Sequence, residues 1–344
     1  MKLQTPVADE KCKFGISYND KTMMLGSCFT DNIGKRLHNF GFDVCVNPFG
    51  TLYNPASIYE SVIRLIQGTP FTENDSTKIG AGSDRICSFH HHTSFSRETS
   101  EEFLDNANRA LKDSAAFFKK CNKVIITLGT SWCYRHLETD RIVCDCLKHP
   151  AAEFTREFLP ADRTEELLKA IISTCKDLAA SDPEFCEKQF IFTISPIRHF
   201  KDGAHGNQLS KSALLLGADS AIIAHQNDAD YFPAYEIFMD ELRDYFAIFP
   251  LGMSHCLAQR GKKLGLQGSD AHVSAVSGLI EIIDPASVQK SALPRRHRSA
   301  GKIGCAVHRV ERNNAVLHGD VDELAFSCPL AINDRREDRG NRVH

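Results

Sequence analysis

Residues 22–30, TMMLGSCFT, join a short apolar run directly to small and polar side chains. The run from Thr22 to Leu25 predicts a buried parallel strand. Residues 26–28, Gly-Ser-Cys, then form a tight turn, and Thr30 is placed to cap a helix from residue 31 to about residue 40. This stretch therefore predicts a strand, a turn and a helix in direct succession.

Two further apolar runs repeat the strand pattern, residues 124–128 (VIITL) and residues 190–194 (FIFTI). Each ends abruptly in small or polar residues, Gly129-Thr130-Ser131 after the first and Ser195-Pro196 after the second. In a parallel sheet the carboxyl ends of the strands meet at one rim, and ligands bind beyond that rim. The three polar strand ends are therefore predicted to converge.

Helical patterns separate the three predicted strands. Ser100 is placed to cap a helix that extends to about Lys119, and Asp162 with Glu165 predicts a capping box for another. Strands that alternate with helices form a parallel sheet covered on both faces. The sequence therefore predicts an α/β fold, a three-layer α/β/α sandwich with a parallel central sheet.

The turn at residues 26–28 is a suitable place for a nucleophile. A tight turn exposes its side chains, and the start of the following helix offers backbone N–H groups and the positive end of the helix dipole. We expect this setting to lower the pKa of the Cys28 thiol. The alternative is a turn of small residues that only allows the strand and the helix to pack.

The overall composition is that of a folded globular protein. The 344 residues are 42% hydrophobic and 25% charged, with a net charge of −3. A nearly neutral balance gives no reason to expect nucleic acid or an anionic membrane as a partner. The first residues lack the apolar run of a signal peptide, and no stretch of about 18 apolar residues predicts a membrane span, so we expect a cytoplasmic protein.

The 13 cysteines are scattered and odd in number, which does not fit a disulfide framework. Cys144 and Cys146, predicted to share one face of a strand, lie near Cys133, His136 and His149 in the sequence. This spacing matches no standard zinc pattern, so we predict no metal site there. The adjacent histidines 90–92 are not expected to bind a metal either, because three consecutive residues of a strand cannot face one ion.

The chain changes character near Tyr245. All seven tyrosines and the single tryptophan occur at or before this position, and the net charge changes from −7 before the break to +4 after it. We place the domain boundary at residue 248 and expect residues 249–344 to be a basic, poorly ordered tail. A separate basic binding module and a tail produced by a shifted reading frame are the alternatives.

Several blocks of residues 1–245 resemble the GSCFA family, which is grouped with the SGNH hydrolases. The string LGSCFTDNIG at residues 25–34 is similar to the signature that gives the family its name. The similarity continues in order along the chain. The further blocks are residues 47–50 (NPFG), 54–55 (NP), 90–96 (HHHTSFS), 128–132 (LGTSW), 195–199 (SPIRH), 207–211 (NQLSK), 231–233 (YFP) and 239–245 (MDELRDY).

The resemblance implies an SGNH-like sandwich that cleaves or transfers acyl groups, and it implies site residues. Cys28 lies at the position of the catalytic serine of the relatives, with Ser27 as the neighbouring alternative. Gly50 is similar to the glycine that lends its N–H group to the oxyanion hole. In the block Gly129-Thr130-Ser131, Ser131 replaces the asparagine that supplies a second oxyanion donor.

A catalytic base is harder to place. SGNH enzymes end with an Asp-x-x-His motif, and this chain reads Gly252-Met253-Ser254-His255 where the motif is expected. His255 is thus a candidate base without its orienting carboxylate, which fixes the imidazole tautomer in such enzymes. Arg198 and His199 follow the third predicted strand and are candidates for substrate binding, or form a purely structural pair.

The resemblance, together with the turn at residues 26–28, implies an acyl-ester hydrolase or acyltransferase that acts on a small or carbohydrate-linked ester and needs no cofactor. Cys28 or Ser27 attacks the ester carbonyl, backbone N–H groups near Cys28 and Gly50 stabilise the oxyanion, and His255 passes the proton. The alternative is a non-catalytic domain of the same fold that binds a small ligand at this rim. A redox or metal protein that uses the thiols is a third hypothesis. The sequence predicts no oligomeric state.

Overall fold

The computed structural model of the protein describes residues 12–80 and 82–242, together with residues 5 and 7. Their central element is a five-stranded sheet in the order β10-β9-β5-β1-β2, in which every neighbouring pair is parallel. The three predicted strands are confirmed, and they hold the three inner positions of the sheet. The strands are β1 (Lys21–Gly26), β2 (Asp43–Val46), β5 (Lys123–Leu128), β9 (Gln189–Ile194) and β10 (Ala229–Tyr231).

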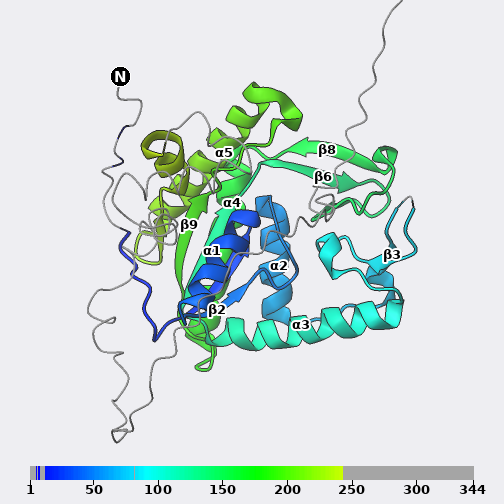
Figure 1. The fold of residues 1–344 in the computed structure, drawn as a ribbon. Coiled ribbons are helices and arrows are strands. Elements are labelled where there is room, and N and C mark those ends of the chain that lie inside the picture. Colours follow the sequence, from blue (N-terminus) through cyan, green and yellow to red (C-terminus); the bar gives the residue numbers. More distant parts are fainter. Residues whose placement is uncertain (1–4, 6, 8–11, 81, 243–344) are drawn as a thin grey trace, which may run out of the picture. The chain divides into compact units, whose positions relative to one another are not determined.

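The inner strands are buried on both faces, because their side chains alternate between two apolar cores. Met23 and Leu25 of β1 face the larger core, whereas Met24 faces the smaller one. Helices contribute to both cores, so the predicted three-layer α/β/α sandwich is confirmed (Figure 1). The larger core receives side chains from α2 (Pro55–Gln67), α3 (Ser100–Lys120), α4 (Ala161–Ser181) and α5 (Gly203–Ala224), and the smaller core from α1 (Cys28–Asn39).

The first helix begins three residues earlier than predicted. Ser27, not Thr30, is the N-cap: its backbone is extended (φ −70°, ψ 179°), and its hydroxyl accepts a hydrogen bond from the N–H group of Phe29. Thr30 is instead buried inside the first turn of α1. Helix α1 therefore begins at Cys28, which brings the thiol to the first helical position.

The starts of two other helices also differ from the predictions. Thr99, rather than Ser100, caps α3, because its hydroxyl accepts from the N–H group of Glu102 at 3.1 Å. The predicted capping box at Asp162 is absent, since Pro160 occupies the N-cap position of α4 and no side chain caps it. Proline is common at helix starts because its fixed φ suits the first turn.

Two small antiparallel sheets accompany the main sheet. One consists of β6 (Trp132–His136), β7 (Arg141–Val143) and β8 (Phe154–Phe158), in the order β7-β6-β8, and Figure 1 shows β6 and β8 beyond the carboxyl end of the main strands. The other pairs β3 (Thr77–Lys78) with β4 (Ile86–Cys87). Cys144 and Cys146 follow β7 rather than lie within a strand, so that prediction was wrong. The described chain ends after α6 (Ala234–Glu236) and a π-helical turn, Ile237–Glu241.

No helix in the described ranges is both long enough and apolar enough to cross a membrane. His255, the domain boundary at residue 248 and the basic tail lie outside the described residues.

Candidate active site

The turn after β1 requires glycine. Gly26 has φ +144°, and a Cβ atom there would lie 2.3 Å from the carbonyl oxygen of Thr127 on the adjacent strand. Two hydrogen bonds with residues of the loop that follows β2 fix the backbone of this turn. The N–H group of Gly26 donates to Oδ1 of Asn47 at 2.8 Å, and its carbonyl accepts from the N–H group of Leu52 at 2.9 Å. Residues 47–52 therefore fix the backbone that presents the next two side chains.

The two candidate nucleophiles in this turn differ in exposure, because Ser27 is buried and Cys28 is partly exposed. The side chain of Ser27 is only 1% exposed, and its hydroxyl accepts from the N–H group of Phe29 at 3.3 Å as the helix cap. Cys28 is partly exposed and is the first residue of α1. Ser27 therefore caps the helix, whereas Cys28 remains partly exposed at the first helical position.

The pKa of the Cys28 thiol is raised above its ordinary value, contrary to the sequence-based expectation. Burial is the main cause, and the carboxylate of Asp31 acts in the same direction. The N–H groups of Cys28 and Phe29 and the ammonium of Lys211 oppose this shift and are outweighed. At neutral pH the group is therefore mainly a thiol, so its use as a nucleophile requires a partner that takes the proton.

Asp31 lies one helical turn after Cys28, on the same side of α1. Its Oδ1 atom accepts a hydrogen bond from Nδ2 of Asn47 at 2.5 Å. Burial raises the pKa of Asp31, while the bond from Asn47 and the nearby His92 lower it. The side chain of Asn47 thus accepts a hydrogen bond from Gly26 in the turn and donates one to Asp31, so it links the turn to the first turn of α1.

Gly50 does not offer a free oxyanion donor. Its N–H group donates to the carbonyl of Asn47 at 2.8 Å. Its φ of +85°, and the 2.5 Å that would separate a Cβ atom from the Cβ of His92, explain why glycine occupies the position. Gly50 therefore belongs to the loop that supports the turn, and its predicted part in an oxyanion hole is not supported.

The N–H groups of Gly129 and Ser131 are likewise engaged in hydrogen bonds within the protein. The N–H groups of Gly129 and Thr130 both donate to the carbonyl of Tyr53, each at 2.9 Å. Ser131 is fully buried: its N–H group donates to Oγ of Ser210 at 2.8 Å, and its own Oγ donates to the carbonyl of Ser210 at 2.8 Å. Ser131 therefore joins the end of β5 to α5 and does not replace the asparagine donor.

Lys211 lies at the same rim and was not predicted as a site residue. It is completely buried, with 0% exposure, and its Nζ atom donates to the carbonyls of Gly129 at 2.6 Å and Ser195 at 2.7 Å. These carbonyls directly follow β5 and β9. Burial lowers the pKa of Lys211 to about 7, an effect that Cys28 opposes and Arg198 reinforces. Lys211 is thus an amine close to its own titration point at neutral pH.

His199 and Tyr53 are in contact beyond the end of β9. Their rings meet edge to face with 5.8 Å between centroids. The Nε2 atom of His199 is buried with no hydrogen-bond partner among the described residues, and burial, with a smaller contribution from Lys211, lowers its pKa to about 4. Burial raises the pKa of Tyr53, and Cys28 is among the charges that add to this shift. We call Cys28, Tyr53, His199 and Lys211 the rim cluster.

A sequence signal for Lys211 exists in hindsight. Leu214, Ala218 and Ala221 form the buried stripe of α5, at spacings of three or four residues. Lys211 continues this stripe by one turn, which places a charged side chain where an apolar one is expected. A lysine on the buried face of a helix is rare unless it is paired or functional.

The histidine run does not join the rim cluster as a whole. The ring of His91 is fully buried against Phe49, Phe71, Phe95 and Phe103, and burial lowers its pKa to about 3. This is a core position. Within the described part of the chain, no group of three or more His, Cys, Asp or Glu side chains is arranged to hold a metal ion.

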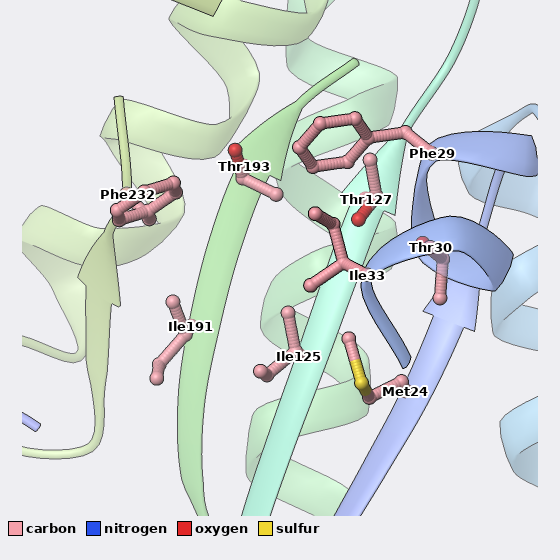
Figure 2. Close-up of a pocket in the computed structure, with 9 residues that line it drawn as sticks. All are labelled: Met24, Phe29, Thr30, Ile33, Ile125, Thr127, Ile191, Thr193 and Phe232. Atoms are coloured by element: carbon pink, nitrogen blue, oxygen red, sulfur yellow. The ribbon is translucent and has the colours of Figure 1, made fainter. Parts of the chain in front are cut away.

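A small cavity lies on the α1 face of the sheet, beside the residues that follow Cys28. Figure 2 shows Met24, Ile125 and Ile191 next to one another on three adjacent strands, with Phe29 and Ile33 of α1 near them. Its volume of about 10 Å³ gives room for about one water molecule. The hydroxyls of Thr30 and Thr193, which line it, have no partner among the described residues. The cavity belongs to the smaller core and cannot hold an acyl substrate.

Comparison with known proteins gives one match. The profile of the GSCFA family matches residues 21–260, whereas no curated protein and no solved structure matches the chain. The matched range contains every member of the rim cluster. It also passes Tyr245 and includes His255, so the family similarity continues for a short distance beyond the change in composition.

Proposed function

The chain belongs to the GSCFA family, and we propose that it hydrolyses or transfers acyl groups with Cys28 as the nucleophile. The observation that carries the proposal is the placement of this thiol. Cys28 is partly exposed at the first position of α1, directly beyond the carboxyl end of an inner strand, whereas Ser27 is committed to the helix cap. Ligands bind at this edge of open parallel sheets.

In the proposed reaction the sulfur of Cys28 attacks the carbonyl carbon of a small ester. The alcohol leaves, and the acyl group remains on the sulfur as a thioester until water or a second alcohol removes it. The backbone N–H group at the start of α1 supports the negative charge on the carbonyl oxygen, aided by the helix dipole. The proposal requires no cofactor.

One observation favours a second candidate, a ligand-binding domain without catalysis. The two donors that the family resemblance assigns to an oxyanion hole, at Gly50 and Ser131, are both engaged within the protein. Loss of a single such donor lowers the rate of acyl-transfer enzymes about 100- to 1,000-fold. A domain of this kind would hold the same small ligand at the rim and release it unchanged.

Hydrolysis of a short aryl acetate by the full chain and by two variants separates the candidates. We expect Cys28→Ala to reduce turnover to the uncatalysed background, because the nucleophile is gone. Ser27→Ala is the matched control, since it alters the adjacent hydroxyl and leaves the thiol in place. Equal turnover by the wild type and Cys28→Ala would contradict the proposal and favour the binding domain.

A further inference from the structure

Lys211 has a hydrogen-bond arrangement that suits a neutral amine. A lysine ammonium has three N–H donors, and a neutral amine has two N–H donors and one lone pair. The Nζ atom of Lys211 donates to two carbonyls, those of Gly129 and Ser195. Two acceptors satisfy both donors of the amine and leave its lone pair for an incoming proton. An ammonium in the same place would bury a third donor that has no hydrogen-bond acceptor among the described residues, and its aromatic neighbour is the Tyr235 ring, with 5.9 Å between Nζ and the ring centroid.

Lys188 is a second buried lysine of the same protein, and its hydrogen bonds can be compared with those of Lys211. It is also buried, with 7% exposure, but its Nζ atom donates to three carbonyls, those of Phe118 at 2.7 Å, Cys121 at 3.0 Å and Cys186 at 3.2 Å. Three acceptors match the three donors of an ammonium. The two lysines therefore differ in the number of acceptors as well as in position.

Intermediate contacts connect the amine of Lys211 to the turn that carries the thiol, and no hydrogen bond joins Nζ to the Cys28 sulfur among the described residues. Lys211 bonds the carbonyl of Gly129, and a Cβ atom on Gly129 would lie 3.3 Å from the Cδ1 atom of Tyr53. Leu52, next to Tyr53, donates to the carbonyl of Gly26 in the turn that precedes the thiol. Cys28 and Lys211 also act on each other electrostatically.

The other charged and titratable groups around this pair come from α1, the loop before α2, the loop after β9, and α6. Asp31 of α1 and Tyr53 of the loop before α2 interact electrostatically with Cys28. Arg198 and His199 of the loop after β9 interact electrostatically with Lys211, whose Nζ atom also lies 5.9 Å from the ring centroid of Tyr235 in α6. The positive charge of Arg198 favours the neutral form of Lys211, and the negative charge of Asp31 favours the protonated form of Cys28. Both influences favour a neutral resting pair, a thiol and an amine.

We propose that Lys211 accepts the proton of the Cys28 thiol as the sulfur attacks the acyl carbon, an inference that rests on the acyl-transfer function proposed above. The S–H bond breaks while the S–C bond and a new N–H bond form. The ammonium then returns the proton to the leaving alkoxide as the C–O bond breaks, and the amine is restored. A pKa of about 7 suits this exchange, because a general base is most effective when its pKa lies near the working pH.

The first test uses no ester substrate, so its outcome does not depend on the proposed function. Iodoacetamide alkylation of Cys28 is followed by peptide mass spectrometry between pH 6 and 10, with the exposed Cys186 of the same sample as reference. We expect Lys211→Met to slow the alkylation of Cys28 about tenfold at pH 8, where the neutral amine of the wild type accepts the thiol proton. Lys188→Met is the matched control and is expected to leave the Cys28 profile unchanged.

Lys211→Gln provides the same test with N–H donors retained, should the methionine variant fail to fold by circular dichroism. A Cys28 profile that is unchanged in the folded Lys211 variant overturns the inference. Lys211→Arg then distinguishes a proton acceptor from a fixed charge, because arginine carries a permanent charge and cannot accept a proton. We expect this variant to keep rapid alkylation but to lose at least about 100-fold in ester turnover. Full turnover with arginine would also overturn the proton transfer.

Discussion

Lys188 and Lys211 are buried at opposite ends of the same sheet. The carbonyls that Lys188 binds, at Phe118 and Cys121, end α3 before β5 begins, whereas those that Lys211 binds directly follow β5 and β9. Lys188 also lies 4.0 Å from the centroid of the Phe185 ring, a closer cation–π approach than the 5.9 Å between the Nζ atom of Lys211 and the centroid of the Tyr235 ring. Burial lowers the pKa of both side chains. The two lysines therefore share burial and a lowered pKa, and they differ in the number of their acceptors and in their place in the sheet.

The largest expected difference between the two lysines is in the pH dependence of turnover, which should follow Lys211 and not Lys188. If Lys211 must be neutral to accept a proton, kcat/KM of the wild type rises about tenfold per pH unit below pH 7 and levels off above it. Between pH 5 and pH 7 this amounts to about 100-fold. The profile is measured with an aryl acetate in constant ionic strength, and Lys188→Met should retain it. A profile that is flat between pH 5 and pH 7 would remove Lys211 from the reaction.

The second prediction concerns stability at the other end of the sheet. Lys188→Met leaves three buried carbonyls without their donor, and we expect the free energy of unfolding to fall by about 2–3 kcal/mol. Turnover per folded molecule should not change. Urea unfolding followed by circular dichroism gives the first quantity, and the aryl acetate assay gives the second. A stable Lys188→Met variant with low turnover would reverse the roles assigned to the two lysines.

The third prediction uses the shifted pKa of Lys211 itself. Its pKa is about 7 in the folded chain and 10.5 when unperturbed, so between these values the unfolded chain binds a proton that the folded chain does not. The stability of the wild type relative to Lys211→Met should therefore rise with pH in this window, by about 1.4 kcal/mol per pH unit. Below about pH 7 the difference should be constant. The free energies of unfolding of both proteins, measured from pH 6 to pH 10, test whether this difference rises with pH.

The smallest predicted effect separates Ser27 from its neighbour. Ser27→Ala removes the cap of α1, and we expect a loss of about 1 kcal/mol in the free energy of unfolding. The Cys28 alkylation profile should stay close to that of the wild type, because the thiol keeps its helix position. A greatly altered profile would show that the Ser27 hydroxyl does more than cap the helix.

The fold was predictable from the sequence because the inner strands are buried on both faces. Such strands appear as continuous apolar runs, and each of the three runs forms the core of a strand. The helix starts were less predictable. Ser27 and Thr30 are both good capping residues, and only the backbone of the turn decides which hydroxyl meets a free N–H group.

The candidate site was predictable in position but not in composition. Cys28 and His199 do lie at the rim, since both follow the ends of inner strands. Gly50 and Ser131 differ from their expected roles because their partners, Asn47 and Ser210, are determined by the folded loops and not by the local sequence. Lys211 comes from α5, far along the chain from Cys28, and only the fold brings the two together.

The most direct test of the account is to locate the acyl group on the protein. The full chain is incubated briefly with an aryl acetate, quenched in acid to preserve thioesters, and digested for peptide mass spectrometry. We predict a single acetylated site at Cys28, formed more slowly when Lys211 is replaced by methionine and absent from Cys28→Ala. Turnover without acetyl on Cys28, or with acetyl on another side chain in its place, would contradict the account.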